Sequence, residues 1–239
     1  MTRLDLLVSE IREKADKKRS ERAKSFSKTG IGEYGEGDVF IGISTPVLRV
    51  IARKYFDLKL NDLEKLLGSR IHEERSLALM ILAQKYKRGK EESAKSEIYD
   101  FYIKNRKGVN NWGLVDISAW HIAGNFLIDH SKDRSVLYEF ARSSDLWERR
   151  ISIVATYAFI RKNQFDDTLK ICEILMRDSH DLIHKACGWM LREVGKKDQK
   201  ILEEFLRKNY DKMPRTTLRY AIEKFPEKKR KLCLKGKFD

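Results

Sequence analysis

The stretch GLVDISAWHI, residues 113–122, places one acidic residue inside an otherwise apolar segment with helical spacing. Four further segments share this form, in which polar or basic residues interrupt an apolar helical pattern: EERSLALMIL (73–82), ERRISIVATY (148–157), HKACGWMLRE (184–193) and TLRYAIEKF (217–225). The chain has only three prolines, and no segment alternates between apolar and polar residues over a strand's length. We therefore expect an all-α protein.

The five segments recur at a regular distance. One polar residue in each serves as a reference point, and the successive intervals are 41, 34, 35 and 34 residues for Arg75, Asp116, Arg150, Lys185 and Arg219. These intervals are typical of helical-hairpin repeats of the HEAT type, which stack into a curved α-solenoid. The alternative is that the charged residues only cap or bridge neighbouring helices. We expect one domain over residues 1–239, ending in a basic tail from about residue 226 that frays or contacts phosphates.

The charge of the chain indicates a polyanionic partner. Lysine and arginine number 50 against 36 acidic residues, which gives a formal net charge of +14. Nucleic acid is the usual partner of such a surface, and an anionic membrane is less common. The N-terminus has no apolar core of a signal peptide, and polar residues such as Asp116 and His121 argue against a membrane span over 108–128. The three cysteines form no C-x-x-C pair, so we expect a soluble, cytoplasmic protein without a membrane partner.

Two motifs resemble ligand sites without the context that such sites require. GIGEYG, residues 30–35, matches G-x-G-x-x-G, but no strand pattern precedes it, and Glu33 and Glu36 would repel a pyrophosphate. His180 and His184 have the spacing of a metal-binding helix face, but no third ligand accompanies them. The sequence therefore predicts no cofactor and no metal.

Trp112 and Asp116 form the pair of residues that most favours a chemical site. They lie four residues apart, hence on one face of one helix, with Asn110 or Asn111 as its N-cap. This places Asp116 near the second turn and the positive end of the helix dipole. One reading makes Trp112 a core residue and bridges Asp116 to an arginine of a neighbouring helix, such as Arg150. The other reading makes Asp116 catalytic, and the residues alone leave both open.

Five stretches of the sequence resemble those of a known family: VFIGISTPVLRVIARK, HEERSLALMILAQK, VNNWGLVDISAWHIAG, LWERRISIVAT and IHKACGWMLREVGKKD. In this order they resemble the AlkD-like DNA alkylation repair family, from about Tyr34 to Gly195. The signatures N-N-W-x-L-V-D and K-A-x-G-W-x-L-R-E carry most of the resemblance. It implies a HEAT-like-repeat DNA glycosylase that excises N3- and N7-alkylated purines from double-stranded DNA and acts as a monomer.

The resemblance also implies roles for particular residues. Asp116 falls on the family's catalytic aspartate, and Trp112, Arg150 and Trp189 fall on its other active-site positions. Tyr34 falls near a family tyrosine that contacts DNA, although its setting GEYGEGD departs from the family pattern. The basic residues expected to bind phosphates in the groove are Arg149, Lys185 and Arg192.

The chemistry of an alkylated purine agrees with a single acidic residue. Glycoside hydrolases normally need two carboxyl groups, one of which protonates the leaving group. A purine alkylated at N3 or N7 already carries a positive charge and leaves as a neutral base. One carboxylate is then sufficient to stabilise the sugar cation and orient water. Two alternatives are a non-catalytic HEAT-repeat scaffold that recognises damaged or branched DNA, and a protein-interaction solenoid.

Overall fold

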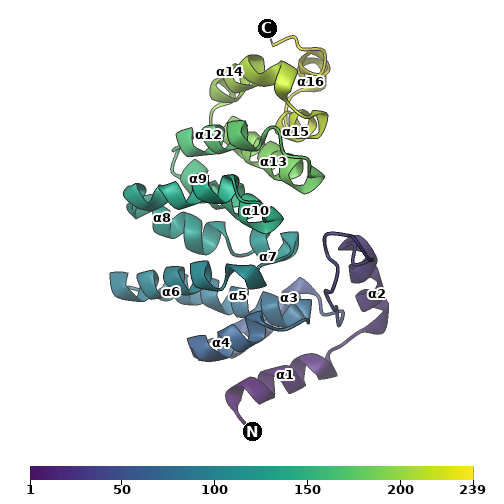
Figure 1. Ribbon diagram of the computed structural model, residues 1–239, viewed down its shortest axis with the longest axis vertical. Coiled ribbons are helices and arrows are strands. Elements are labelled where there is room, and N and C mark those ends of the chain that lie inside the picture. Colours follow the sequence, from purple (N-terminus) through teal and green to yellow (C-terminus); the bar gives the residue numbers. More distant parts are fainter. Residues whose placement is uncertain (239) are drawn as a thin grey trace. The chain divides into compact units, whose positions relative to one another are not determined.

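The computed structural model describes residues 1–238, and the regular structure in this range is helical (Figure 1). These residues contain no β-strand, and extended segments pair only at an isolated parallel bridge between Val39 and Ile71. The all-α class predicted from the sequence is confirmed. Within the same range, no helix combines the length and the apolar character needed to cross a membrane.

The helices fall into two compact units, Met1–Ala123 and Gly124–Asp239, and each is considered by itself. The first unit contains α1 (Arg3–Glu13), α2 (Lys17–Phe26), α3 (Thr45–Lys54), α4 (Leu60–Leu67), α5 (His72–Arg88), α6 (Glu92–Lys104) and α7 (Trp112–Asp116). The second contains α8 (Asn125–Asp129), α9 (Ser135–Ala141), α10 (Leu146–Ala155), α11 (Tyr157–Arg161), α12 (Asp166–Leu175), α13 (Asp181–Lys197), α14 (Gln199–Asn209), α15 (Arg215–Ala221) and α16 (Glu227–Cys233). A single domain over residues 1–239 stays a prediction.

One long helix forms the centre of each unit. In the first unit, α5 packs against α3, α4, α6 and α7, and every residue from Glu73 to Leu82 is buried. A helix that is apolar on most sides is expected at the centre of a helical stack. In the second unit, α13 packs against α10, α12, α14 and α15. This layering of helices inside each unit is that of a helical-repeat protein (Figure 1).

The segment 109–128 is less regular than its apolar pattern predicts. Helix α7 ends at Asp116, a turn follows, a π-helical turn covers Trp120–Gly124, and α8 begins at Asn125. Asp116 is thus the last residue of a short helix. The buried Ser118 hydroxyl donates to the Leu114 carbonyl at 2.6 Å, and such a bond to the preceding turn competes with regular helix hydrogen bonding.

The basic C-terminal segment is folded, which corrects the expectation of a frayed end. From residue 227 it forms α16, and Cys233 and Phe238 are buried. The Leu234 carbonyl accepts hydrogen bonds from the Tyr210 hydroxyl at 3.1 Å and from Arg215 at 2.9 Å. These contacts hold the segment against the rest of the second unit.

Candidate functional site

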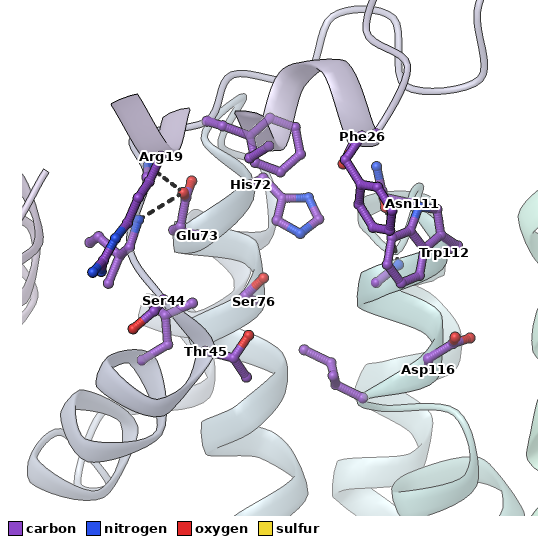
Figure 2. Close-up of a pocket in the computed structure, with 18 of the residues that line it drawn as sticks. Arg19, Phe26, Ser44, Thr45, His72, Glu73, Ser76, Asn111, Trp112 and Asp116 are labelled. Atoms are coloured by element: carbon purple, nitrogen blue, oxygen red, sulfur yellow. Dashed lines mark hydrogen bonds between the residues drawn. The ribbon is translucent and has the colours of Figure 1, made fainter. Parts of the chain in front are cut away.

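A cavity of about 370 Å³ lies in the first unit, between residues contributed by α2, α3, α5, α7 and the loop before α3. Figure 2 shows it with Trp112 and Asp116 on one of its sides and the first turn of α5 on another. Its charged and titratable lining residues are Arg19, His72, Glu73 and Asp116. Its remaining lining combines apolar side chains and glycines with polar residues, namely Ser27, Ser44, Thr45, Ser76 and Asn111.

Helix α7 presents Trp112 and Asp116 to this cavity one turn apart. The helix begins after Asn111, whose side-chain oxygen accepts the backbone N–H of Gly113 at 3.0 Å. Of the two caps that the sequence allows, Asn111 therefore occupies the N-cap. Both Trp112 and Asp116 line the cavity, and both are half-buried. The pair chosen from the sequence is thus brought to one cavity.

Phe26, at the end of α2, is a lining residue that the sequence did not single out. Its ring meets Trp112 edge to face, with centroids 5.5 Å apart and planes at 81°. The Phe26 side chain nevertheless remains 69% exposed. The signal in the sequence is an aromatic residue closing the strongly basic helix KKRSERAKSF. Phe26 therefore presents an exposed aromatic ring beside Trp112 at the cavity.

Tyr34, expected to contact DNA, is not among the described residues that line the cavity. Its hydroxyl donates to the Phe26 carbonyl at 3.3 Å, so it contacts the C-terminal end of α2. The glycine-rich loop around it is closed by its own acidic residues. The Gly30 and Gly32 N–H groups donate to the carboxylates of Glu33 and Glu36 at 2.8 and 2.9 Å. Those amides therefore already have anionic acceptors.

A buried polar network holds the N-terminal end of α7 against α5. Asp38 accepts from Arg75 at 2.5 Å and from the Asn111 amide at 2.9 Å, and His72 Nδ1 lies 3.4 Å from the same carboxylate. Burial raises the pKa of Asp38, but His72 and the charge of Arg75 outweigh it and hold that pKa below its usual value. Arg75 also donates to the Ser69 carbonyl at 2.6 Å. Arg75, one of the five residues that mark the repeat pattern, therefore stabilises the fold.

Glu73, beside His72 on α5, fixes the loop that forms another side of the cavity. Its carboxylate accepts the backbone N–H groups of Ile41, Gly42 and Ile43 at 2.8 to 3.3 Å. Figure 2 shows Glu73 with dashed lines for hydrogen bonds to this loop. At 3% exposure, this carboxylate is buried and satisfied by backbone donors. Glu73 is therefore a structural acid.

The other residues chosen from the sequence lie in the second unit. Arg150 is buried on α10 and donates to the Leu182 carbonyl at 2.6 Å. Arg149 donates to Asp178 at 2.5 Å, and also to the Ser143 and Ser144 carbonyls. Their proposed roles toward DNA stay predictions.

Three further predicted residues lie on α13. Trp189 is half-buried, with its ring centroid 6.1 Å from that of Tyr157. Lys185 pairs with Asp181 at 2.7 Å, and Arg192 pairs with Glu193 at 3.2 Å and with Glu223. Several of these cations are thus committed to carboxylates of the chain itself, and any DNA contact would compete with those pairs.

The two histidines with metal-like spacing make local hydrogen bonds. His184 Nε2 donates to the Asp178 carbonyl at 2.6 Å, and His180 Nδ1 accepts the Leu182 N–H at 3.2 Å as the N-cap of α13. In residues 1–238, no group of three or more His, Cys, Asp or Glu is placed to hold a metal ion.

Comparison with known proteins identifies a family whose model the sequence matches. The family model described as "DNA alkylation repair enzyme" matches residues 7–225. A solved structure described as "Predicted DNA alkylation repair enzyme from Enterococcus faecalis" superposes with a TM-score of 0.69 and 16% sequence identity. The superposition covers 89% of this chain and 97% of that chain, so it supports the fold. No curated protein matches the sequence.

Proposed function

The chain belongs to the DNA alkylation repair enzyme family, and on that premise we propose that it is a monofunctional DNA glycosylase. Its substrates are N3- and N7-alkylated purines in duplex DNA, whose bases carry a positive charge. The observation that carries this proposal is the placement of Trp112 and Asp116 on adjacent turns, lining one cavity. The AlkD-like signatures around both residues support the same activity.

The proposed reaction uses the charge that alkylation has already placed on the base. The C1′–N bond breaks with its electron pair moving to the base, which leaves as a neutral purine. Positive charge then develops on the deoxyribose, and the Asp116 carboxylate stabilises it. A carboxylate positioned where charge appears in the transition state typically contributes a factor on the order of 10² to 10³ in rate. Water held by the same carboxylate attacks C1′.

The aromatic residues supply contacts for a cationic base or sugar. Trp112 and Phe26 both line the cavity, and a cation over an aromatic ring gains on the order of 0.5–2 kcal/mol. From the family resemblance, we propose that Arg150 and Trp189 contribute to the reaction and that Arg149, Lys185 and Arg192 bind phosphates. No lysine is among the described residues lining the cavity, so we propose no Schiff-base step and no strand cleavage.

The surface charge supports a search over undamaged DNA. Phosphate contacts give affinity without reading sequence, as an enzyme that looks for rare lesions requires. Helix α2 adds Lys17, Lys18, Arg22 and Lys24 beside the cavity residue Arg19. We propose that the protein acts as a cytoplasmic monomer on DNA.

An excision assay tests the proposed activity. Duplex DNA with a single 7-methylguanine is incubated with the protein, and abasic sites are revealed by alkaline cleavage. We expect abasic sites at the lesion and intact strands before alkali. Binding to the lesion duplex without abasic product would instead indicate a non-catalytic DNA-binding scaffold.

A further inference from the structure

His72 lies in the same cavity as Asp116, and the proposed reaction gives it no role. The residue begins α5, and its side chain is 14% exposed. In Figure 2 its ring lies between Glu73 and Asn111, near the start of α7. The ring stacks on Phe40 with centroids 4.5 Å apart and planes at 26°. Stacking on Phe40 therefore fixes the orientation of the imidazole on one of its faces.

The two ring nitrogens of His72 have different surroundings. Nδ1 lies 3.4 Å from Asp38, whose negative charge favours the tautomer that carries its proton on Nδ1. Nε2 faces the beginning of α7, since a Cβ added to Gly113 would lie only 3.6 Å from it. In the neutral imidazole, Nε2 then carries the lone pair and can accept a proton. This is the arrangement in which a carboxylate orients a histidine base.

Charged groups come from every element around the ring and the cavity: Asp38, in the loop before α3, lies beside the ring, Arg75 on α5 pairs with Asp38, and Glu73 on α5, Arg19 on α2 and Asp116 on α7 line the cavity. The Arg75 guanidinium is shared with Asp38, and Glu73 is bound by three backbone amides. Asp38 is therefore the carboxylate that contacts the ring directly. Its charge stabilises the imidazolium formed when Nε2 accepts a proton.

The proton balance of the proposed reaction requires such an acceptor. A cationic base leaves neutral, so it takes only the electron pair of the broken C1′–N bond. The attacking water forms a C1′–O bond and releases one proton, which neither the base nor the sugar accepts. If Asp116 took that proton, it would lose the charge that stabilises the sugar. Imidazole, whose ordinary pKa is about 6.5, is also a stronger base than aspartate, whose ordinary pKa is about 3.9.

We propose that His72, oriented by Asp38, is the general base that receives the proton of the attacking water in this cavity. The inference rests on the proposed glycosylase activity and adds a second catalytic residue to Asp116. The proton passes to Nε2 directly or through one intervening water, which is the usual reach of a general base. Asp116 then remains ionised throughout the reaction.

The pH dependence of single-turnover excision tests this role. His72→Gln is compared with the wild type on the 7-methylguanine duplex from pH 5 to 8, because the ratio of the two rates cancels the titration of the substrate. A base must be unprotonated to accept a proton, so we expect the ratio to rise with pH and to reach on the order of 10² above pH 7.5. A ratio that does not change with pH would overturn the proposal and make His72 a structural residue.

His130→Gln is the matched control. His130 also stacks on a phenylalanine, Phe126, with centroids 4.0 Å apart, and its Nδ1 bonds a backbone carbonyl at 2.8 Å. His130 is not among the described residues that line this cavity. We expect its rate ratio to the wild type to stay near one at every pH. A pH-dependent ratio for this variant would mean that the His72 result reports general histidine titration.

Chemical rescue distinguishes the loss of a base from the loss of the volume of the side chain. Imidazole added to His72→Ala should restore excision, whereas pyrazole, a similar ring of much weaker basicity, should not. Equal rescue by both rings, or by neither, would contradict a general base. Asp116→Asn separates this inference from the proposed function. If Asp116→Asn abolishes excision while His72→Gln shows a constant ratio, only the inference fails, whereas absence of wild-type excision removes both.

Discussion

At the scale of single residues, substitution of the exposed Phe26 tests whether the cavity binds the substrate. The substitution should change the stability of the fold only slightly. Its side chain is mostly solvent-exposed, so Phe26→Ala should lower the free energy of unfolding by about 1 kcal/mol or less. Excision should nevertheless fall on the order of 10-fold, because one aromatic contact to the cationic base is lost. Phe26→Tyr, which keeps the ring, should retain excision. Equal rates for Phe26→Ala and the wild type would remove Phe26 from the site.

The buried Asp38 carboxylate makes a prediction about acid stability. Its pKa is lowered in the folded protein, so the unfolded chain binds protons more readily near pH 4. The stabilisation from Asp38 is therefore complete above the unfolded pKa of about 3.9 and is lost as the pH falls through the folded value. Asp38→Asn should cost about 3–5 kcal/mol at pH 7, as for a broken buried pair.

Urea unfolding at pH 7 and at pH 3 measures both parts of that prediction. The difference between the wild type and Asp38→Asn should shrink at the lower pH. A difference that stays constant or grows on acidification would show that the charge of Asp38 does not stabilise the fold.

The sequence predicted two of the residues that line the cavity, and local spacing determined the placement of both. Trp112 and Asp116 share a cavity because they lie four apart on one helix, a relation that needs no tertiary structure. Phe26 and His72 reach the same cavity from segments far away in the sequence. Their placement depends on how α2 and α5 pack beside α7, which no local pattern encodes. Tyr34, carried over from the family resemblance, contacts the end of α2, and its role toward DNA stays a prediction.

At the scale of helices, Gly188 sets the distance between α13 and α15. A Cβ at Gly188 would lie 2.5 Å from the Tyr220 Cβ and 2.7 Å from the Thr217 carbonyl oxygen. Gly188→Ala should therefore force the two helices apart and cost about 1–3 kcal/mol, as overpacking does. Thermal denaturation of Gly188→Ala against the wild type measures the effect.

Gly68→Ala is the control for that substitution. Its nearest atoms would lie at 3.6 Å, which is ordinary van der Waals contact, and its φ of −78° suits alanine. We expect its melting temperature to match or exceed that of the wild type. If Gly188→Ala melted no lower than Gly68→Ala, close packing of α13 on α15 would be contradicted.

The helices themselves followed from the apolar periodicity, but their interruptions did not. The pattern over 109–128 predicts a helix, whereas a turn and a π-helical turn separate α7 from α8. The cause lies in buried contacts: Ser118 bonds back to Leu114, and its hydroxyl also lies 3.2 Å from that of Tyr102 on α6. A serine in an apolar pattern does not reveal whether such a partner exists.

At the scale of the whole molecule, the net charge of +14 predicts that DNA binding depends strongly on salt. Each phosphate contact releases counterions, so affinity for undamaged duplex should fall by about 10³-fold or more between 50 and 200 mM salt if six or more contacts form. Fluorescence anisotropy with two unrelated sequences should give equal slopes. Binding that does not change with salt would favour a protein-interaction solenoid over a DNA-binding one.

The repeat signal in the sequence was informative about the fold because a repeated helix pair must bury the same face each time. It was less informative about the role of each reference residue. Arg75 proved to be a buried brace of Asp38, and Lys185 pairs with Asp181. Asp116, at the equivalent place in its segment, instead lines a cavity. The reference residues thus form ion pairs in two of the five segments and line a cavity in another.

The most direct test of the central claim is single-turnover excision of 7-methylguanine by Asp116→Asn, with affinity for the lesion duplex measured in parallel. The amide keeps the size of the side chain but removes the charge that stabilises the sugar cation. We predict that affinity changes little and that excision falls by roughly 10²-fold or more. Asp129→Asn, an exposed acid at the end of α8, should excise at the wild-type rate. Excision by Asp116→Asn at the wild-type rate would contradict the assignment of Asp116 as the catalytic carboxylate.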